Sequence, residues 1–272
     1  SESRGLGDVY KRQVWKELNL PDPTPIQYEI ADYMQRGDRR AIIEGFRGVG
    51  KSWICSAFVV HQLLLDPRRN ILVVSASKTR ADDFSTFTLR LIHELPILAH
   101  LRPSDKQRFS KISFDVGPAP ASHAPSVKSL GVTSQLTGSR ADIIVADDIE
   151  VVGNSATQGM RDKLGEQVKE FDAIIKPDAT SKILFLGTPQ CEDTIYNKLT
   201  ERGYRKRIWP AKYVTSKTND ANYDGAVSHI CVDDEAEGAS TEPLRFSDID
   251  LAEREASYCL LYTSPSPRDS DS

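Results

Sequence analysis

The chain has 272 residues, of which 39% are hydrophobic and 27% charged. This composition is typical of folded globular domains and excludes disordered and collagen-like chains. No apolar run approaches the roughly 20 residues of a membrane helix, and the start of the chain lacks the apolar core of a signal peptide. The net charge of −4 is unevenly divided: residues 219–257 carry −9 and residues 258–272 carry −1, which leaves residues 1–218 mildly basic at +6.

Apolar runs of strand length alternate with longer helical patterns, which predicts an α/β fold with a mostly parallel sheet flanked by helices. The predicted strands are residues 41–44, 71–76, 111–116, 142–147, 182–187 and 204–209. The predicted helices are residues 53–65, 79–95 and 156–175. Residues 117–126 are rich in Pro, Ala and Ser, and are predicted to form a loop.

The strongest motif is GFRGVGKS at residues 45–52, which matches the phosphate-binding loop (P-loop) pattern G-x-x-x-x-G-K-[ST] between a predicted strand and a predicted helix. Glycines let the backbone N–H groups approach phosphate oxygens at the helix N-terminus. Lys51 is expected to neutralise the β and γ phosphates, and the Ser52 hydroxyl to bind Mg²⁺. The expected nucleotide-binding residues of this loop are Gly45, Arg47, Gly48, Val49, Gly50, Lys51 and Ser52.

A second motif supplies the carboxylates that such a loop requires. Residues 143–150 read IIVADDIE, an apolar strand that ends in acids. This is the pattern of a Walker B element, in which Asp147 holds Mg²⁺ and the next acid polarises the attacking water. Asp148 has the usual position of that acid, but Glu150 lies two residues further on and is an alternative.

Three weaker signals fall where an ATPase would use them. Gln27 precedes the P-loop strand and is either an adenine-reading amide or a polar residue at a helix start. Thr188 follows the strand at residues 182–187 and is placed to sense the γ-phosphate. Arg47 and Arg140 are alternative arginine fingers, and for Arg140 a surface salt bridge is a rival interpretation.

Together, GFRGVGKS, VSASKTRAD, SFDVGPAPASHAPSVKSLGVTSQLTGSRADIIVADDIE, NSATQGMRDKL and FLGTPQ resemble the large terminase subunit, or DNA maturase B, of short-tailed phages. The resemblance runs from about residue 14 to residue 257. It implies an ATP-driven DNA-packaging motor with a P-loop NTPase domain of the additional-strand, RecA-like class, followed by a ribonuclease-H-like nuclease domain. Many members of the family have Glu at the position of Asp148.

The resemblance further implies ATP and Mg²⁺ as cofactors, and action in the cytoplasm of an infected bacterium. The implied partners are double-stranded DNA, the portal protein of the procapsid and the small terminase subunit, with a homo-oligomeric ring as the assembled form and no membrane. From the charge pattern, the candidate DNA-contacting cations cluster around the last predicted strand, for which a solvated strand face is the alternative interpretation: Arg202, Arg205, Lys206, Arg207 and Lys212.

The expected organisation is an ATPase domain at residues 14–218 and a solvated acidic linker at residues 219–257 that leads towards an absent nuclease domain, so DNA cleavage is not expected. Residues 1–13 and 258–272 are expected to be non-native leader and tail. Two other functions compete with the motor: a fragment of a two-domain, helicase-type DNA-dependent ATPase, and a nucleotide-binding assembly module without turnover.

Overall fold

The computed structural model describes residues 16, 22–190 and 193–257. The expected leader and tail lie outside this part of the chain. Seven described strands form one sheet in the order β3-β4-β2-β5-β6-β1-β7. All neighbouring pairs are parallel except β3 with β4. The strands are β1 (Arg40–Gly45), β2 (Ile71–Ser75), β3 (Ser113–Phe114), β4 (Val127–Gly131), β5 (Ile143–Asp147), β6 (Lys182–Gly187) and β7 (Arg205–Trp209).

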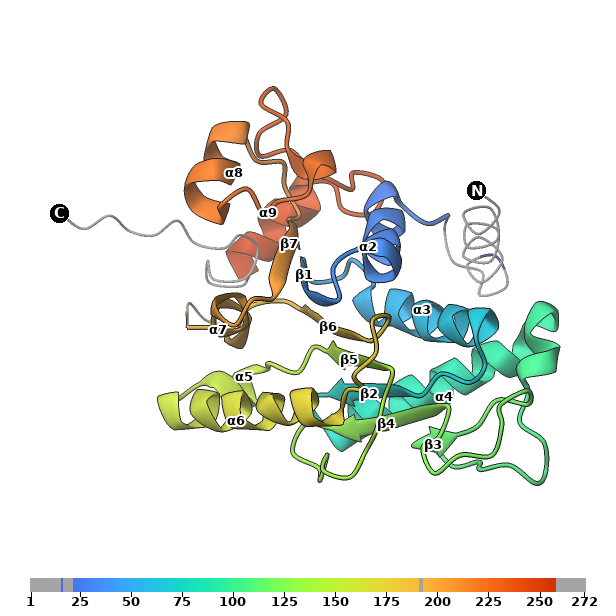
Figure 1. Cartoon of the computed structure of the whole chain (residues 1–272). Helices are drawn as coiled ribbons and strands as arrows, with labels where there is room; N and C mark the ends of the chain where they lie inside the picture. The colour runs from blue at the N-terminus through green and yellow to red at the C-terminus, as the bar shows by residue number, and fades with distance from the viewer. Residues whose placement is uncertain (1–15, 17–21, 191–192, 258–272) are drawn as a thin grey trace.

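Helices cover both faces of this sheet (Figure 1). One face packs against α2 (Pro25–Arg36), α3 (Lys51–Leu65) and α4 (Lys78–Glu94), and the other against α6 (Gln158–Ile174) and α7 (Ile195–Glu201). The remaining described helices are α5 (Val152–Ser155), α8 (Ser216–Tyr223), α9 (Asp248–Ser257) and the 3₁₀ turns η1 (Pro96–Leu101) and η2 (His229–Cys231). Within the described residues, none of the helices is long and apolar enough to span a membrane.

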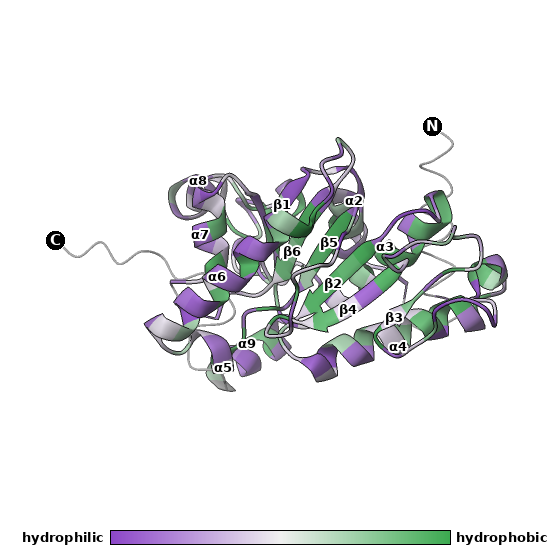
Figure 2. Ribbon diagram, turned by 60° about the horizontal axis from the view of Figure 1, so that its bottom comes forward, coloured by the Kyte–Doolittle hydropathy of each residue, from purple (hydrophilic) through white to green (hydrophobic). Residues whose placement is uncertain are grey.

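The central strands are apolar because both of their faces are buried (Figure 2). Along β5, Ile143 and Val145 face one apolar cluster, whereas Ile144 and Ala146 face the other. Apolar side chains on both faces are therefore removed from water on folding, and each Å² of apolar surface buried stabilises the fold by about 25 cal/mol.

The order of the strands confirms the predicted fold class. β6 lies between β1, which leads into the P-loop, and β5, which carries the Walker B acids. A strand inserted at this point distinguishes the additional-strand class of P-loop NTPases. Glu44 pairs with Gly187, and Asp147 pairs with Leu186, so the ends of all three strands meet at one edge of the sheet.

The strand prediction was wrong at one edge of the sheet. Residues 111–116 contribute only the two-residue strand β3, and β4 (Val127–Gly131) was missed. The sequence of β4, VKSLG, alternates apolar and polar residues over only five positions, and its burial alternates in the same way. Such a short, half-buried strand carries a weak sequence signal.

The acidic segment at residues 219–257 is not a solvated linker. It folds against the P-loop, because Phe246 and, in α9, Leu251 pack in the same apolar cluster as Phe46 of the P-loop. The Phe246 ring is buried and contacts the Phe46 ring edge-on at 5.6 Å. Arg245 donates a hydrogen bond to the Gly48 carbonyl at 3.1 Å, and the Glu242 carboxylate is buried and accepts from the Thr24 hydroxyl. Apolar anchors among the acids therefore dock this segment on the domain.

Candidate functional site

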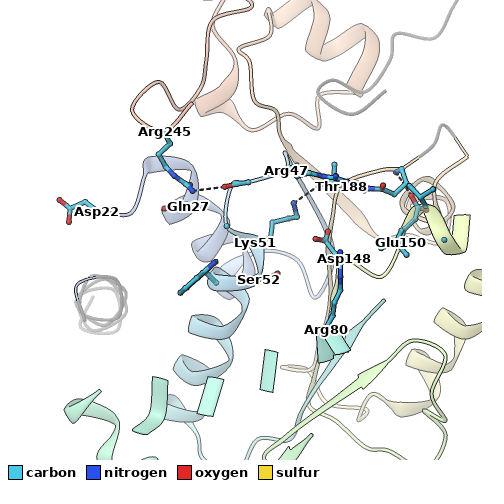
Figure 3. A pocket seen from close by; sticks show the side chains of 17 residues that line it. Asp22, Gln27, Arg47, Lys51, Ser52, Arg80, Asp148, Glu150, Thr188 and Arg245 are labelled. Atoms are coloured by element: carbon cyan, nitrogen blue, oxygen red, sulfur yellow. Dashed lines mark hydrogen bonds between the residues drawn. The ribbon is translucent and has the colours of Figure 1, made fainter. Parts of the chain in front are cut away.

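A cavity of about 760 Å³ opens at the carboxyl edge of the sheet, within the range of roughly 300–1,000 Å³ that is typical of small-molecule sites. The P-loop, the ends of β5 and β6, the start of α4 and the segment around Arg245 all contribute to its walls. Figure 3 shows Gln27 and Arg245 on one side of Lys51, and Asp148 and Arg80 on the other. The cavity therefore has two chemically different ends.

The P-loop has the backbone conformation that its glycines permit. Gly48 and Gly50 have φ angles of 97° and 92°, in the left-handed region that disfavours residues with a Cβ atom. A Cβ on Gly48 would also lie 2.9 Å from a ring carbon of Phe246. Gly50 is the N-cap of α3, so the helix N-terminus begins at the loop and directs its free N–H groups towards it.

Lys51 lies on the floor of the cavity and is almost fully buried. Its Nζ donates to the Gly45 carbonyl at 3.0 Å and to Thr188 Oγ1 at 2.9 Å. Burial lowers the pKa of this ammonium group, and the nearby charges of Asp148 and Asp147 oppose that effect. Neutral oxygens hold Nζ in place without neutralising it, so an anion that enters the cavity gains a strong, desolvated partner.

Ser52 and Asp147 form a pair that fits a divalent cation. Ser52 Oγ donates to Asp147 Oδ2 at 2.8 Å, while Asp147 Oδ1 is buried without a hydrogen-bond partner. Burial, followed by the charge of Asp148, raises the pKa of Asp147 to about 6. A hydroxyl and a carboxylate are hard oxygen ligands of the kind that Mg²⁺ prefers, and a cation would remove the cost of the unpartnered oxygen.

The two candidate water-polarising acids differ sharply in their surroundings. Asp148 lines the cavity, is partly exposed, and has a φ of 46°, which is unusual for a residue with a side chain. Glu150 also lines the cavity, but its carboxylate is buried, and both of its oxygens accept hydrogen bonds. Its donors are Gln190 N at 2.9 Å, Thr194 Oγ1 at 2.8 Å and Ile195 N at 2.7 Å. Glu150 therefore fastens the start of α7 to the end of β5.

The other predicted residues are distributed unequally. Thr188 Oγ1 donates to the Gly45 carbonyl at 2.8 Å, which joins the end of β6 to the P-loop. Arg47 lines the cavity. Arg140 does not, because its guanidinium donates to the Ala173 carbonyl on α6, at the opposite end of β5. The geometry therefore removes Arg140 as an arginine finger within its own chain.

Gln27 lies at the cavity, but its amide already has protein partners. Nε2 donates to the Val49 carbonyl at 2.9 Å, and Oε1 accepts from Thr24 N at 3.1 Å as part of a capping box at the start of α2. The structure thus places Gln27 at a helix start, where its amide also supports the P-loop, and a role in reading adenine stays a prediction.

The cavity-lining residues that sequence reasoning missed include Trp53, Arg80 and Arg245. Trp53 directly follows the P-loop motif and Arg80 lies in the VSASKTRAD motif, so both could have been considered. Arg245 lies 194 residues beyond Lys51 in the numbering, and no local pattern connects it to the P-loop.

The basic cluster around β7 is largely used within the protein. Lys206 Nζ lies 3.0 Å from Glu44 Oε1, and both side chains are buried or nearly so. Lys212 pairs with Glu255 at 2.7 Å, and the guanidinium of Arg207 lies 5.0 Å from the centre of the Tyr33 ring. These three cations are thus engaged within the protein, and the assignment of this strand to DNA contact stays a prediction.

No protein-family model matches the chain. Over 253 residues it is 50% identical to the terminase large subunit of Enterobacteria phage T3, a match that covers 90% of this chain and 43% of that protein. The chain thus spans less than half the length of this relative. Its fold is similar to that of the DEAD-box helicase Mss116, with a TM-score of 0.50, 14% identity, and coverage of 72% of this chain and 41% of the helicase.

The ATPase domain of the Thermus phage P74-26 large terminase has a TM-score of 0.40 at 16% identity, over 65% of this chain and 68% of that one. The likeness to the helicase describes the fold, whereas the sequence match extends across nearly the whole chain. On that match, the chain is a relative of the terminase large subunits and corresponds to less than half of the phage T3 protein.

Proposed function

We propose that this chain is the ATP-hydrolysing motor domain of a viral terminase large subunit, which drives double-stranded DNA into the procapsid. One observation carries the proposal: Lys51, Ser52 and Asp148 line one cavity, and Ser52 is hydrogen-bonded to Asp147, in a chain that is 50% identical to a terminase large subunit. We also propose that the acidic segment belongs to this motor unit, because Phe246 and Leu251 are part of the same core as the P-loop strand.

In this proposal the P-loop binds the triphosphate. Its backbone N–H groups and the N-terminus of α3 surround the phosphate oxygens, and Lys51 Nζ neutralises the β and γ phosphates. Ser52 and Asp147 would hold Mg²⁺, which lowers the negative charge at the phosphates when it is bound. Thr188 contacts both Lys51 and the Gly45 carbonyl, so it would link the state of the γ-phosphate to β6.

Asp148 is the proposed acid that polarises the attacking water. Its carboxylate faces the cavity beside the metal-binding acid, and its left-handed backbone holds it there. We assign Glu150 a positioning role, because its three donors leave little capacity to accept a proton from water. Arg47 is the proposed arginine that stabilises charge in the transition state.

The proposed partners follow from the relationship with terminases. They are double-stranded DNA, the portal protein and the small terminase subunit, and several copies of the chain would form a ring around the duplex in the infected bacterial cytoplasm. A motor that moves along any sequence is expected to contact phosphates rather than bases.

The test is phosphate release from ATP with Mg²⁺, measured with and without double-stranded DNA and portal protein. The proposal predicts turnover that DNA or portal stimulates and that Lys51→Ala abolishes. Saturable ATP binding without phosphate release under all of these conditions would instead identify a nucleotide-binding assembly module.

A further inference from the structure

Trp53 is an unusually exposed aromatic residue at the wall of the cavity. It immediately follows Ser52 in the first turn of α3, and 41% of its surface is accessible. The edge-on contact with Phe87 of α4 fixes its ring, with centroids 4.5 Å apart and an interplanar angle of 71°. An indole that is held at one edge and still exposed presents a rigid apolar surface to whatever enters the cavity.

The known contacts of the P-loop do not explain this exposure. Fully exposing a large apolar side chain costs about 1.5–3 kcal/mol relative to burying it, and the neighbouring Phe87 is already packed against the core. The indole is therefore available for an additional apolar partner, and the cavity that it lines is the nearest space for one.

The position of the phosphates indicates what that partner is. Lys51, Thr188 and Asp148 mark the end of the cavity where the terminal phosphate is expected. Figure 3 shows Gln27, Asp22 and Arg245 on the other side of Lys51, so the nucleoside is expected at that end of the phosphate chain. Ser52 is the last residue of the P-loop motif, and Trp53 follows it directly. We therefore expect the sugar and base to leave the P-loop beside Trp53.

The amide that could read the base has limited freedom. Gln27 Oε1 and Nε2 are both engaged, with Thr24 N and the Val49 carbonyl. These two bonds fix the orientation of the amide, so only its second N–H and the second lone pair of Oε1 are left to contact a base. A stacking surface does not depend on that orientation, because every nucleobase has a flat apolar face.

We propose that Trp53 is the platform on which the base of the bound nucleotide stacks. The proposal deepens the proposed function and rests on it. Because stacking strength, rather than a hydrogen-bond pattern, then supplies most of the recognition of the base, the site accepts purine nucleoside triphosphates with similar affinity and pyrimidine ones less well.

The experiment compares a ligand that has a base with one that has none. ATP turnover gives KM and kcat, and inhibition of that turnover by inorganic tripolyphosphate gives an inhibition constant for the phosphate chain alone. Both are measured for the wild type, Trp53→Ala, Trp53→Phe and the control Phe109→Ala, which removes another exposed aromatic ring outside the cavity. Thermal unfolding establishes that each variant is folded.

We expect Trp53→Ala to raise KM for ATP about ten- to a hundred-fold, the range of one lost base–aromatic stack, with kcat and the tripolyphosphate constant close to wild type. Trp53→Phe should retain most of the affinity, and Phe109→Ala all of it. An unchanged KM in Trp53→Ala, or an equal loss of tripolyphosphate binding, would overturn the stacking role. If the wild type neither turns over ATP nor binds tripolyphosphate, the proposed function fails first.

Discussion

Replacing the two neighbouring acids Asp148 and Glu150 by their amides should separate catalysis from positioning. In Glu150→Gln, one side-chain oxygen can keep the bonds from Gln190 N and Thr194 Oγ1, but an amide NH₂ then faces Ile195 N, which donates to Glu150 at 2.7 Å. A buried N–H is left without an acceptor, at a cost of about 1–3 kcal/mol, and the remaining bonds lose their charge assistance.

The expected loss in the free energy of unfolding for Glu150→Gln is therefore about 2–4 kcal/mol. For a domain of this size, 1 kcal/mol lowers Tm by about 2–4 °C, so Tm should fall by at least about 4 °C. Asp148→Asn should leave Tm unchanged, because Asn tolerates the positive φ at this position at least as well as Asp. It should lower kcat by about 10²–10⁴-fold, the usual contribution of a general base.

Scanning calorimetry measures Tm for each variant. Steady-state phosphate release, measured at a temperature well below both melting points, gives kcat. Glu237→Gln, which neutralises an exposed acid, is the matched control for loss of charge and should change neither quantity. The reasoning is wrong if Glu150→Gln keeps the wild-type Tm and loses turnover while Asp148→Asn turns over normally, since Glu150 would then be the base.

Three further predictions concern the metal, the buried ion pair and DNA. Asp147→Asn should abolish Mg²⁺-dependent phosphate release while leaving metal-free binding of ATP measurable, and a Mg²⁺ titration of turnover checks this; normal Mg²⁺ dependence would contradict the metal assignment. Lys206→Ala should lower Tm by several degrees, because it leaves Glu44 buried without its ammonium partner, a change that costs about 3–5 kcal/mol; a Tm equal to that of the wild type would show that the pair is dispensable. DNA-stimulated ATPase should weaken steeply with rising salt, independently of DNA sequence, whereas a flat salt dependence would speak against phosphate contacts.

The sequence was sufficient to predict the parts of the site that depend on local order. The P-loop is contiguous, and its glycines, lysine and serine must follow one another to surround a phosphate. Asp147 could be placed because parallel strands bring their carboxyl ends to one edge, and five of the six predicted strands match described ones to within one residue at each end.

The remaining features depend on contacts between distant residues. The acidity of residues 219–257 suggested solvation, yet Phe246 packs on Phe46, and Arg245 reaches the Gly48 carbonyl. The choice between Asp148 and Glu150 depends on donors from the loop after β6, which sequence spacing does not reveal. Likewise, the pairing of Lys206 with Glu44 becomes visible only when β7 lies beside β1.

The central claim, that this chain is an ATP-driven motor domain, is tested most directly by phosphate release from ATP with Mg²⁺ and double-stranded DNA, in the wild type and in Lys51→Ala. We predict that the wild type releases phosphate continuously and faster with DNA, and that Lys51→Ala releases none above background, because the β and γ phosphates lose their charged partner. Equal phosphate release by the two proteins would contradict the account.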